Sequence, residues 1–380
     1  ALLSSCRDSG IPMVAWQGGE PLLHTNMLQI IELHRSYGIE AMVFTNALVD
    51  PRIIESLKGI VKHVLVNCNE RCTYSVDEWD LLEKNIKNFI QVIGKRGVAL
   101  SYNIYDENMD TDFICDMAYK CGVEEVRIDM TRPAPSHENT HITLPHISTM
   151  FLKLKKILLQ LIEKGIKRPH LDCPFPLCEL SESDCRFVEK YIYDGIKYGS
   201  CYTGIDFSTN LSIQSCFCAP VLKNISINQF DSIWHAWLSI EHLENKLRWA
   251  NVSKEECRNC EYHLRHICQG GCLGYKSNDF GEIDYKKLID FQKDLPDQYI
   301  QLLAKAYQLF YTNQTDQCLI ILDNLPEVKN FERTYWLHAI TNVAKGHYAK
   351  AMEIFKILIT ITSYPAVYAL DAAIVFKNIR

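Results

Sequence analysis

The sequence predicts an α/β fold followed by a small cysteine-rich domain and an all-α tail. Three observations predict it. Over residues 10–165, short apolar runs alternate with segments whose apolar residues recur at helical period. Seven of the 16 cysteines then lie from Cys201 to Cys272, and from residue 296 onward the pattern is helical throughout. The expected domains are therefore 1–168, 169–290 and 296–380.

The first domain is expected to contain five strands that alternate with helices. The strands are predicted at 12–17, 40–45, 62–67, 97–104 and 124–129. The helices are predicted at 25–37, 51–58, 77–93, 110–121 and 145–164, with Thr25 and Asp77 as N-caps. This alternation indicates a parallel sheet or barrel, and such folds bind their ligands at the C-terminal ends of the strands. The segment from about 169 to 285 is expected to be irregular, with short strands.

Composition excludes several classes of partner. The 380 residues carry a formal net charge of -6, which argues against a nucleic-acid or acidic membrane surface. No apolar run reaches the ~18 residues of a membrane span, and no signal peptide is present. Cysteines in metal-ligand spacings indicate a reducing compartment, so we expect a cytoplasmic protein. The chain starts without Met in a helical pattern, so we also expect it to be a fragment.

The stretch VAWQGGEPLLH, residues 14–24, is the most unusual turn in the first domain. Gly18 and Gly19 allow backbone conformations and close approach that side chains forbid. Their carbonyls and the Glu20 carboxylate can hold an ammonium group, and Pro21 favours the start of a helix. The alternative is a tight strand-to-helix turn with a solvated Glu20.

Together with the cysteine-rich segment, this stretch resembles the radical S-adenosylmethionine (SAM) family that carries a SPASM auxiliary-cluster domain. The resemblance covers residues 10–165 and 170–285, about two-thirds of the chain. It implies a partial (β/α)6 barrel that lacks its first strand, in which GGEP holds the amino group of SAM. By position, the family's contacts to the ribose and carboxylate of SAM would come from Thr45, Asn46, Asn67, Asn103 and Arg127. As an alternative, Asn and Thr are ordinary residues at strand ends.

The resemblance also implies auxiliary [4Fe–4S] clusters, since such clusters are held by cysteine thiolates. One would be bound by Cys201, Cys216 and Cys272, and the other by Cys257, Cys260 and Cys268. The fourth ligand of the first would be Cys178, Cys185 or Cys218. Zinc bound by the CxxC pair with His263 and His266 is the competing interpretation. The remaining cysteines in helical patterns are interpreted as small buried hydrophobic residues, namely Cys6, Cys115, Cys121 and Cys318.

The sequence departs from the family pattern in three ways. The CxxxCxxC triad that binds the SAM-ligating cluster is absent, and we expect it upstream of this chain. The CxxxCxxS stretch from Cys68 to Ser75 is rejected as a substitute, because it follows the third strand. No cysteine lies between Cys272 and Cys318, where many SPASM domains place a last ligand. Phe217 stands where sulfatase-maturing relatives carry Asp, which argues against that activity.

The last domain fits the 34-residue helix–turn–helix (TPR) repeat. Tyr335, Trp336 and Ala339 begin the clearer copy, a weaker copy precedes it, and a third starts near Pro365. Such arrays bind peptides or proteins. We therefore expect this tail to hold a peptide or protein substrate.

The function expected from the resemblance is modification of a peptide or protein through a 5′-deoxyadenosyl radical. Its cofactors would be SAM, one upstream cluster and one or two auxiliary clusters. Its reductant would be a flavodoxin or ferredoxin. Two alternatives stay open, a radical SAM enzyme that oxidises a sugar or alcohol and a non-catalytic iron–sulfur scaffold. No catalytic residue is identified.

Overall fold

The computed structural model describes most of the chain. The described residues are 2–134, 139–171, 173, 175–191, 201, 204–216, 218, 222–223, 225–250, 254–264, 268–275, 283–284, 296–325, 331–361, 369 and 371–373. Within them, all 16 cysteines lack disulfide bonds. None of the described helices is long and apolar enough to cross a membrane.

A six-stranded parallel sheet forms the centre of the first half of the chain. Its strands follow the chain order, β1 beside β2 and so on to β6. They are β1 Met13–Trp16, β2 Glu40–Thr45, β3 Val61–Asn67, β4 Val98–Ile104, β5 Glu125–Met130 and β6 Arg168–Leu171. The first five confirm the predicted strands to within one residue at each end. Because all strands are parallel, their C-terminal ends meet at one edge of the sheet.

The strand β6 corrects the expectation that alternation stops at residue 169. Its four residues, RPHL, include a proline and are too few for a clear period. They pair with β5, with Arg127 opposite His170. The hydrophobic core of the sheet also runs on past residue 168, to Phe187 and Val188. The pairing with β5 therefore makes residues 168–171 a strand, although their local sequence carries no strand signal.

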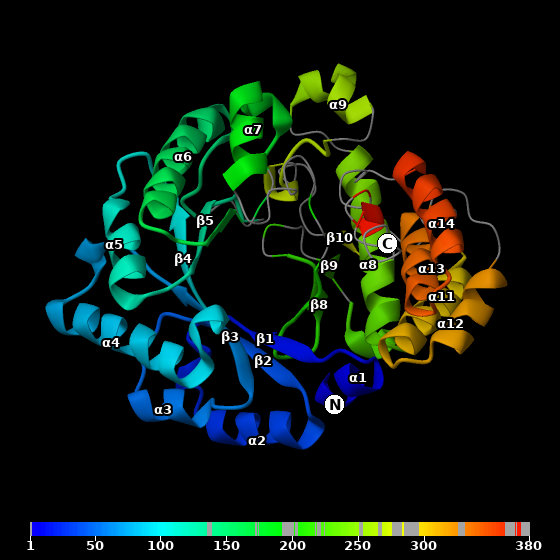
Figure 1. The fold of residues 1–380 in the computed structure, drawn as a ribbon, viewed down its shortest axis with the longest axis horizontal. Coiled ribbons are helices and arrows are strands. Elements are labelled where there is room, and N and C mark those ends of the chain that lie inside the picture. The colour runs from blue at the N-terminus through cyan, green and yellow to red at the C-terminus, as the bar shows by residue number, and fades with distance from the viewer. Residues whose placement is uncertain are drawn as a thin grey trace.

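Helices cover the outer side of the curved sheet (Figure 1). They are α1 Leu2–Asp8, α2 Met27–Tyr37, α3 Pro51–Ser56, α4 Val76–Ile93, α5 Asp112–Cys121, α6 Ile147–Glu163 and α7 Glu182–Tyr191. Ser75, and not Asp77, is the N-cap of α4, because Ser75 and Glu78 form a reciprocal capping box. Asn26, and not Thr25, precedes α2. The four helical cysteines interpreted as hydrophobic are all buried, at 0–7% exposure.

The middle of the chain contains short strands and one long helix. The strands are β7 Asp206–Phe207, β8 Ile213–Gln214, β9 Leu222–Lys223 and β10 Ile283–Asp284. The helices are α8 Ile233–Ala250 and α9 Glu261–Leu264. The 18-residue α8 corrects the expectation of an irregular segment. Its buried face packs against two different neighbours, one core around Ile240 and another around Leu238, so the apolar residues do not form one stripe.

The C-terminal part is helical, as predicted, in the residues that the structure describes. Its helices are α11 Asp297–Tyr311, α12 Thr315–Asp323, α13 Glu332–Ala344 and α14 Tyr348–Ile361. The start of the third predicted repeat, near Pro365, lies outside the described residues. Trp234 of α8 stacks on Tyr307 and Tyr311 of α11, and its indole N–H donates to the carbonyl of Ser9 at 2.8 Å. In Figure 1, α8 lies on the side of the molecule opposite α4, and α11 to α14 lie on the outer side of α8.

Candidate cofactor and metal-binding site

The loop after β1 has a conformation that requires glycine. Gly18 has φ +90° and Gly19 has φ +52°, both in the left-handed region. A Cβ added at either residue would meet no atom within 4 Å, so the backbone conformation and not crowding requires glycine. Both residues are exposed. The loop therefore presents open backbone at the C-terminal edge of the sheet.

The Glu20 carboxylate ties this loop to the end of β2. Its oxygens accept hydrogen bonds from the Thr45 hydroxyl at 2.8 and 2.9 Å, from the Asn46 N–H at 2.7 Å and from the Leu22 N–H at 3.1 Å. Pro21 starts the 3₁₀ turn that Glu20 caps, as expected of proline at a helix start. The structure thus brings Gly18 to Pro21 together with Thr45 and Asn46. The Glu20 carboxylate therefore already accepts hydrogen bonds from Thr45, Asn46 and Leu22.

We expect the substitution Glu20→Ala to destabilise the chain by about 1.5–3 kcal/mol, because a hydrogen bond to a charged group stabilises by about that much. Urea unfolding measures the change. Glu32→Ala is the matched control, since Glu32 is an exposed acid that pairs with Arg35. Equal stability of the two variants would contradict the capping role and leave Glu20 available as a ligand.

The other predicted SAM contacts lie on the neighbouring strands. Asn67, Ser101, Arg127 and His170 are in register across β3 to β6, so they form one row on one face. The Arg127 Nε donates to the Ser101 Oγ at 3.1 Å. Asn103 is exposed in the next row towards the C-terminal edge. Ser101 and His170 were not predicted from the sequence, although the alternation of side chains along the strand from Asn103 points to Ser101.

A buried ion pair follows β5 at the same edge. Arg132 and Asp129 are 2% and 6% exposed in their side chains, with Nη2 and Oδ1 3.5 Å apart. Burial opposes the charge of Arg132, but Asp129, Cys173, Tyr275 and Cys272 together hold its pKa above the usual value. The guanidinium therefore places a positive charge between the sheet and the cysteine-rich segment.

Four cysteines line one cavity. Cys178 follows β6, whereas Cys257, Cys260 and Cys268 come from the cysteine-rich segment. The cavity is small, with a volume of about 20 Å³, and Lys254 and His263 also line it. The backbone N–H of Gly270 donates to the Cys268 sulfur at 3.3 Å.

A second group of thiols contains Cys216, Cys218 and Cys272. The thiol of Cys218 interacts with both others, and its N–H donates to the Cys216 sulfur at 3.4 Å. These hydrogen bonds from Cys218 lower the pKa of Cys216. The N–H of Gly274 donates to the Cys272 sulfur at 3.4 Å. Both groups thus combine clustered thiols with backbone donors to sulfur.

The structure places the predicted fourth ligands near different groups of thiols. Cys178, one of three predicted alternatives for the fourth ligand of the other set, lies with Cys257, Cys260 and Cys268. Cys218 lies with Cys216 and Cys272. The Cys201 N–H donates to Gln269, next to Cys268, at 2.9 Å. Cys185 is on α7 and does not line the cavity. His266 and Phe217 lie outside the described residues.

The described thiols line a small cavity and are not drawn together around a single ion. Among the residues that the structure describes, no three His, Cys, Asp or Glu side chains are close enough together to hold a single metal ion. Zinc binds its sulfur ligands at ~2.3 Å and draws them together tightly. A [4Fe–4S] cluster would instead be held by four separate cysteine thiolates. The donor set fits a group held by four thiolates.

Close glycine contacts fix the cysteine-rich segment against the sheet edge. A Cβ on Gly274 would lie 2.5 Å from the carbonyl oxygen of Pro133, just after β5. A Cβ on Gly271 would lie 2.8 Å from Pro176, after β6. The hydroxyl of Tyr275 donates to the Ile142 carbonyl at 2.7 Å. The thiols consequently lie beyond the C-terminal ends of β5 and β6, at the edge that also carries the Gly18 loop.

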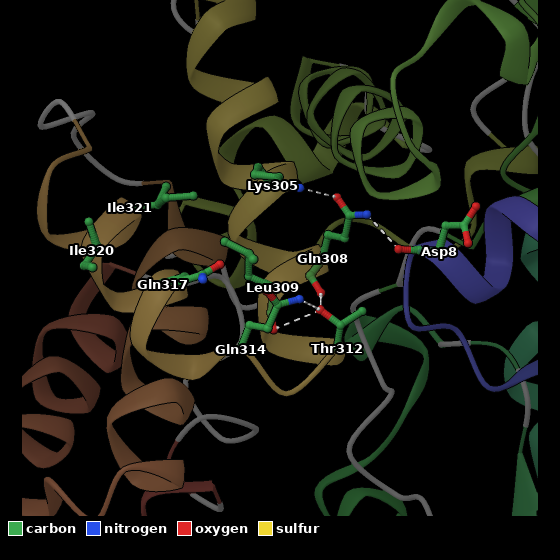
Figure 2. Close-up of a pocket in the computed structure, with 9 residues that line it drawn as sticks. All are labelled: Asp8, Lys305, Gln308, Leu309, Thr312, Gln314, Gln317, Ile320 and Ile321. Carbon is green, nitrogen blue, oxygen red and sulfur yellow. Dashed lines mark hydrogen bonds between the residues drawn. The ribbon is translucent and has the colours of Figure 1, made fainter.

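A separate pocket lies where α11 and α12 meet α1. Figure 2 shows its lining, in which Gln308 donates to the Asp8 carbonyl at 2.7 Å and accepts from Lys305 at 3.2 Å. Gln314 donates to the Thr312 hydroxyl at 3.0 Å. One of these bonds, from Gln308 to Asp8, joins the C-terminal helices to the start of the chain.

No protein-family model matches the sequence, and no curated protein matches it.

Proposed function

We propose that this chain is the cluster-bearing part of a radical SAM enzyme that modifies a peptide or protein. The observation that carries the proposal is the cavity lined by Cys178, Cys257, Cys260 and Cys268, with a second thiol group at the same sheet edge. The class of reaction comes from the resemblance of the GGEP loop and the cysteine spacing to the radical SAM family with a SPASM domain.

Each group of thiols has a role in the proposal. The cavity cysteines would hold one auxiliary [4Fe–4S] cluster. The other would be held by Cys216, Cys218 and Cys272, with Cys201. The N–H donors of Gly270 and Gly274 support this assignment, because hydrogen bonds to sulfur tune the reduction potential of such clusters.

The Gly18 loop would bind the methionine end of SAM. Its exposed glycine backbone would meet the ammonium group, while Glu20 would act by fixing the loop through Thr45 and Asn46. Arg127, Asn67 and Asn103 lie on the adjoining strands for further polar contacts. SAM bound in this loop beside a reduced cluster would supply the radical chemistry that takes a hydrogen atom from the substrate. The proposal therefore requires a CxxxCxxC triad outside these 380 residues and an external reductant such as a flavodoxin or ferredoxin.

Anaerobic reconstitution with ferrous iron and sulfide tests the proposal. Two auxiliary clusters predict about eight iron atoms and eight sulfides per chain, with cluster signals in Mössbauer and electron paramagnetic resonance spectra. Cys260→Ala should lower the iron content to about four, whereas the exposed Cys72 is a control whose change to alanine should leave it unchanged. Binding of zinc with no iron would overturn the proposal.

A non-catalytic iron–sulfur scaffold is the second candidate, and the bonding of Glu20 favours it. A carboxylate that already accepts from Thr45, Asn46 and Leu22 explains the GGEP turn without a ligand. Formation of 5′-deoxyadenosine by a form of the protein that carries the triad, and its loss in Gly19→Val, would separate an enzyme from a scaffold. A sugar or alcohol as substrate instead of a peptide would be found by product analysis.

A further inference from the structure

We propose that Cys178 is the fourth thiolate of the site formed by Cys257, Cys260 and Cys268, so that one metal group joins the segment after β6 to the cysteine-rich segment. The inference rests on the proposed function for the identity of the metal group. The ligand set rests on the structure alone. No cysteine lies between Cys272 and Cys318, and with Cys178 the fourth donor comes instead from earlier in the chain.

Position is the first argument for Cys178. It lines the same cavity as the three other thiols, although about 80 residues of sequence separate it from Cys257. Cys178 is exposed in the middle of the 3₁₀ turn Leu177–Glu179, so its thiol can reach a group in the cavity without displacing a packed side chain. Cys185, seven residues later on α7, does not share the cavity.

Two contacts outside the thiols hold Cys178 in this place. Glu179, the next residue, forms an ion pair with Lys254, three residues before Cys257. The side chains of Glu179 and Lys254 are 11% and 31% exposed, so water screens this pair only in part. On the other side, Pro176 packs on Gly271, where any side chain would clash. The two halves of the site are therefore aligned before a metal binds.

Such a site would couple metal binding to the docking of the two segments. In the unfolded chain Cys178 is far from the other three thiols, so metal bound by all four stabilises only the docked arrangement. Binding releases the thiol protons, one for each thiolate formed. The metal group would thus reinforce the contacts of Pro176 and Glu179 at the sheet edge.

Differential alkylation with mass spectrometry tests the proposal on the chain before and after loading with ferrous iron and sulfide. Loading should slow alkylation of Cys178, Cys257, Cys260 and Cys268 together by at least tenfold, while Cys72 should react at the same rate throughout. In Cys178→Ala, the protection of the other three should fall to less than half, and iron content should fall by up to four per chain. Cys185→Ala is the matched control and should behave like the unmodified chain.

The outcomes separate this inference from the proposed function. If iron binds and Cys178 stays as reactive as before, the fourth-ligand assignment is wrong while the iron–sulfur proposal stands. If no iron binds but zinc alone protects the same four thiols, the ligand set stands and the iron–sulfur proposal fails. If neither metal protects any of the four, both fail.

Discussion

Replacing Arg132 by methionine should lower the free energy of unfolding by about 3–5 kcal/mol, the usual cost of removing one partner from a buried ion pair. Asp129, whose side chain is 6% exposed, would then lack its guanidinium partner. Arg132 also donates to the Met130 carbonyl at 2.8 Å and lies over the Phe175 ring at 5.2 Å. Urea unfolding measures the loss.

Two further variants identify burial as the cause. Arg52→Met removes the same kind of side chain from an exposed pair with Asp50, where the Arg52 side chain is 90% exposed, and should cost less than about 1 kcal/mol. The double variant Asp129→Asn with Arg132→Met should recover at least half of the loss, because no buried charge remains. If Arg132→Met lowers the free energy of unfolding no more than Arg52→Met does, burial of the ion pair is not the cause.

Replacing Arg333 by methionine should destabilise the chain by a similar amount, about 3–5 kcal/mol, and should loosen the C-terminal helices. Arg333 Nε donates to the Glu241 carboxylate of α8 at 2.7 and 3.0 Å, and its Nη2 adds a further bond. The Glu241 side chain is 3% exposed and the Arg333 side chain 13%. The guanidinium also lies 5.1 Å from the centre of the Trp237 ring.

Limited proteolysis beside thermal unfolding measures this effect. Cleavage within α11 to α14 should become faster in Arg333→Met, since this pair joins α13 to α8. Lys345→Met is the control, because Lys345 pairs with Asp316 at the surface of the same helices. The double variant Glu241→Gln with Arg333→Met should regain part of the stability. Unchanged cleavage in Arg333→Met would show that the apolar contacts around Tyr307 hold the helices by themselves.

Much of the fold was predictable because each element carries a local signal. The strands β1 to β5 alternate with amphipathic helices, and their bounds followed from apolar period alone. The strand β6 and the helix α8 lacked such a signal. Four residues are too short to show a period, and α8 divides its apolar face between two cores. Both elements depend on the residues they pack against, and a single sequence does not identify those partners.

The candidate site also has features that the sequence predicts and others that depend on tertiary contacts. The sequence by itself determined that Gly18 and Gly19 end the first strand in a glycine-only conformation and that cysteines concentrate beyond residue 200. Only the tertiary structure decided which thiols meet, because the fold joins Cys178 to Cys257 across a long stretch of chain. It also decided that the Glu20 carboxylate bonds to Thr45 of the next strand. Spacing along a chain specifies local geometry, whereas partners brought together by sheet pairing and docking depend on the whole fold.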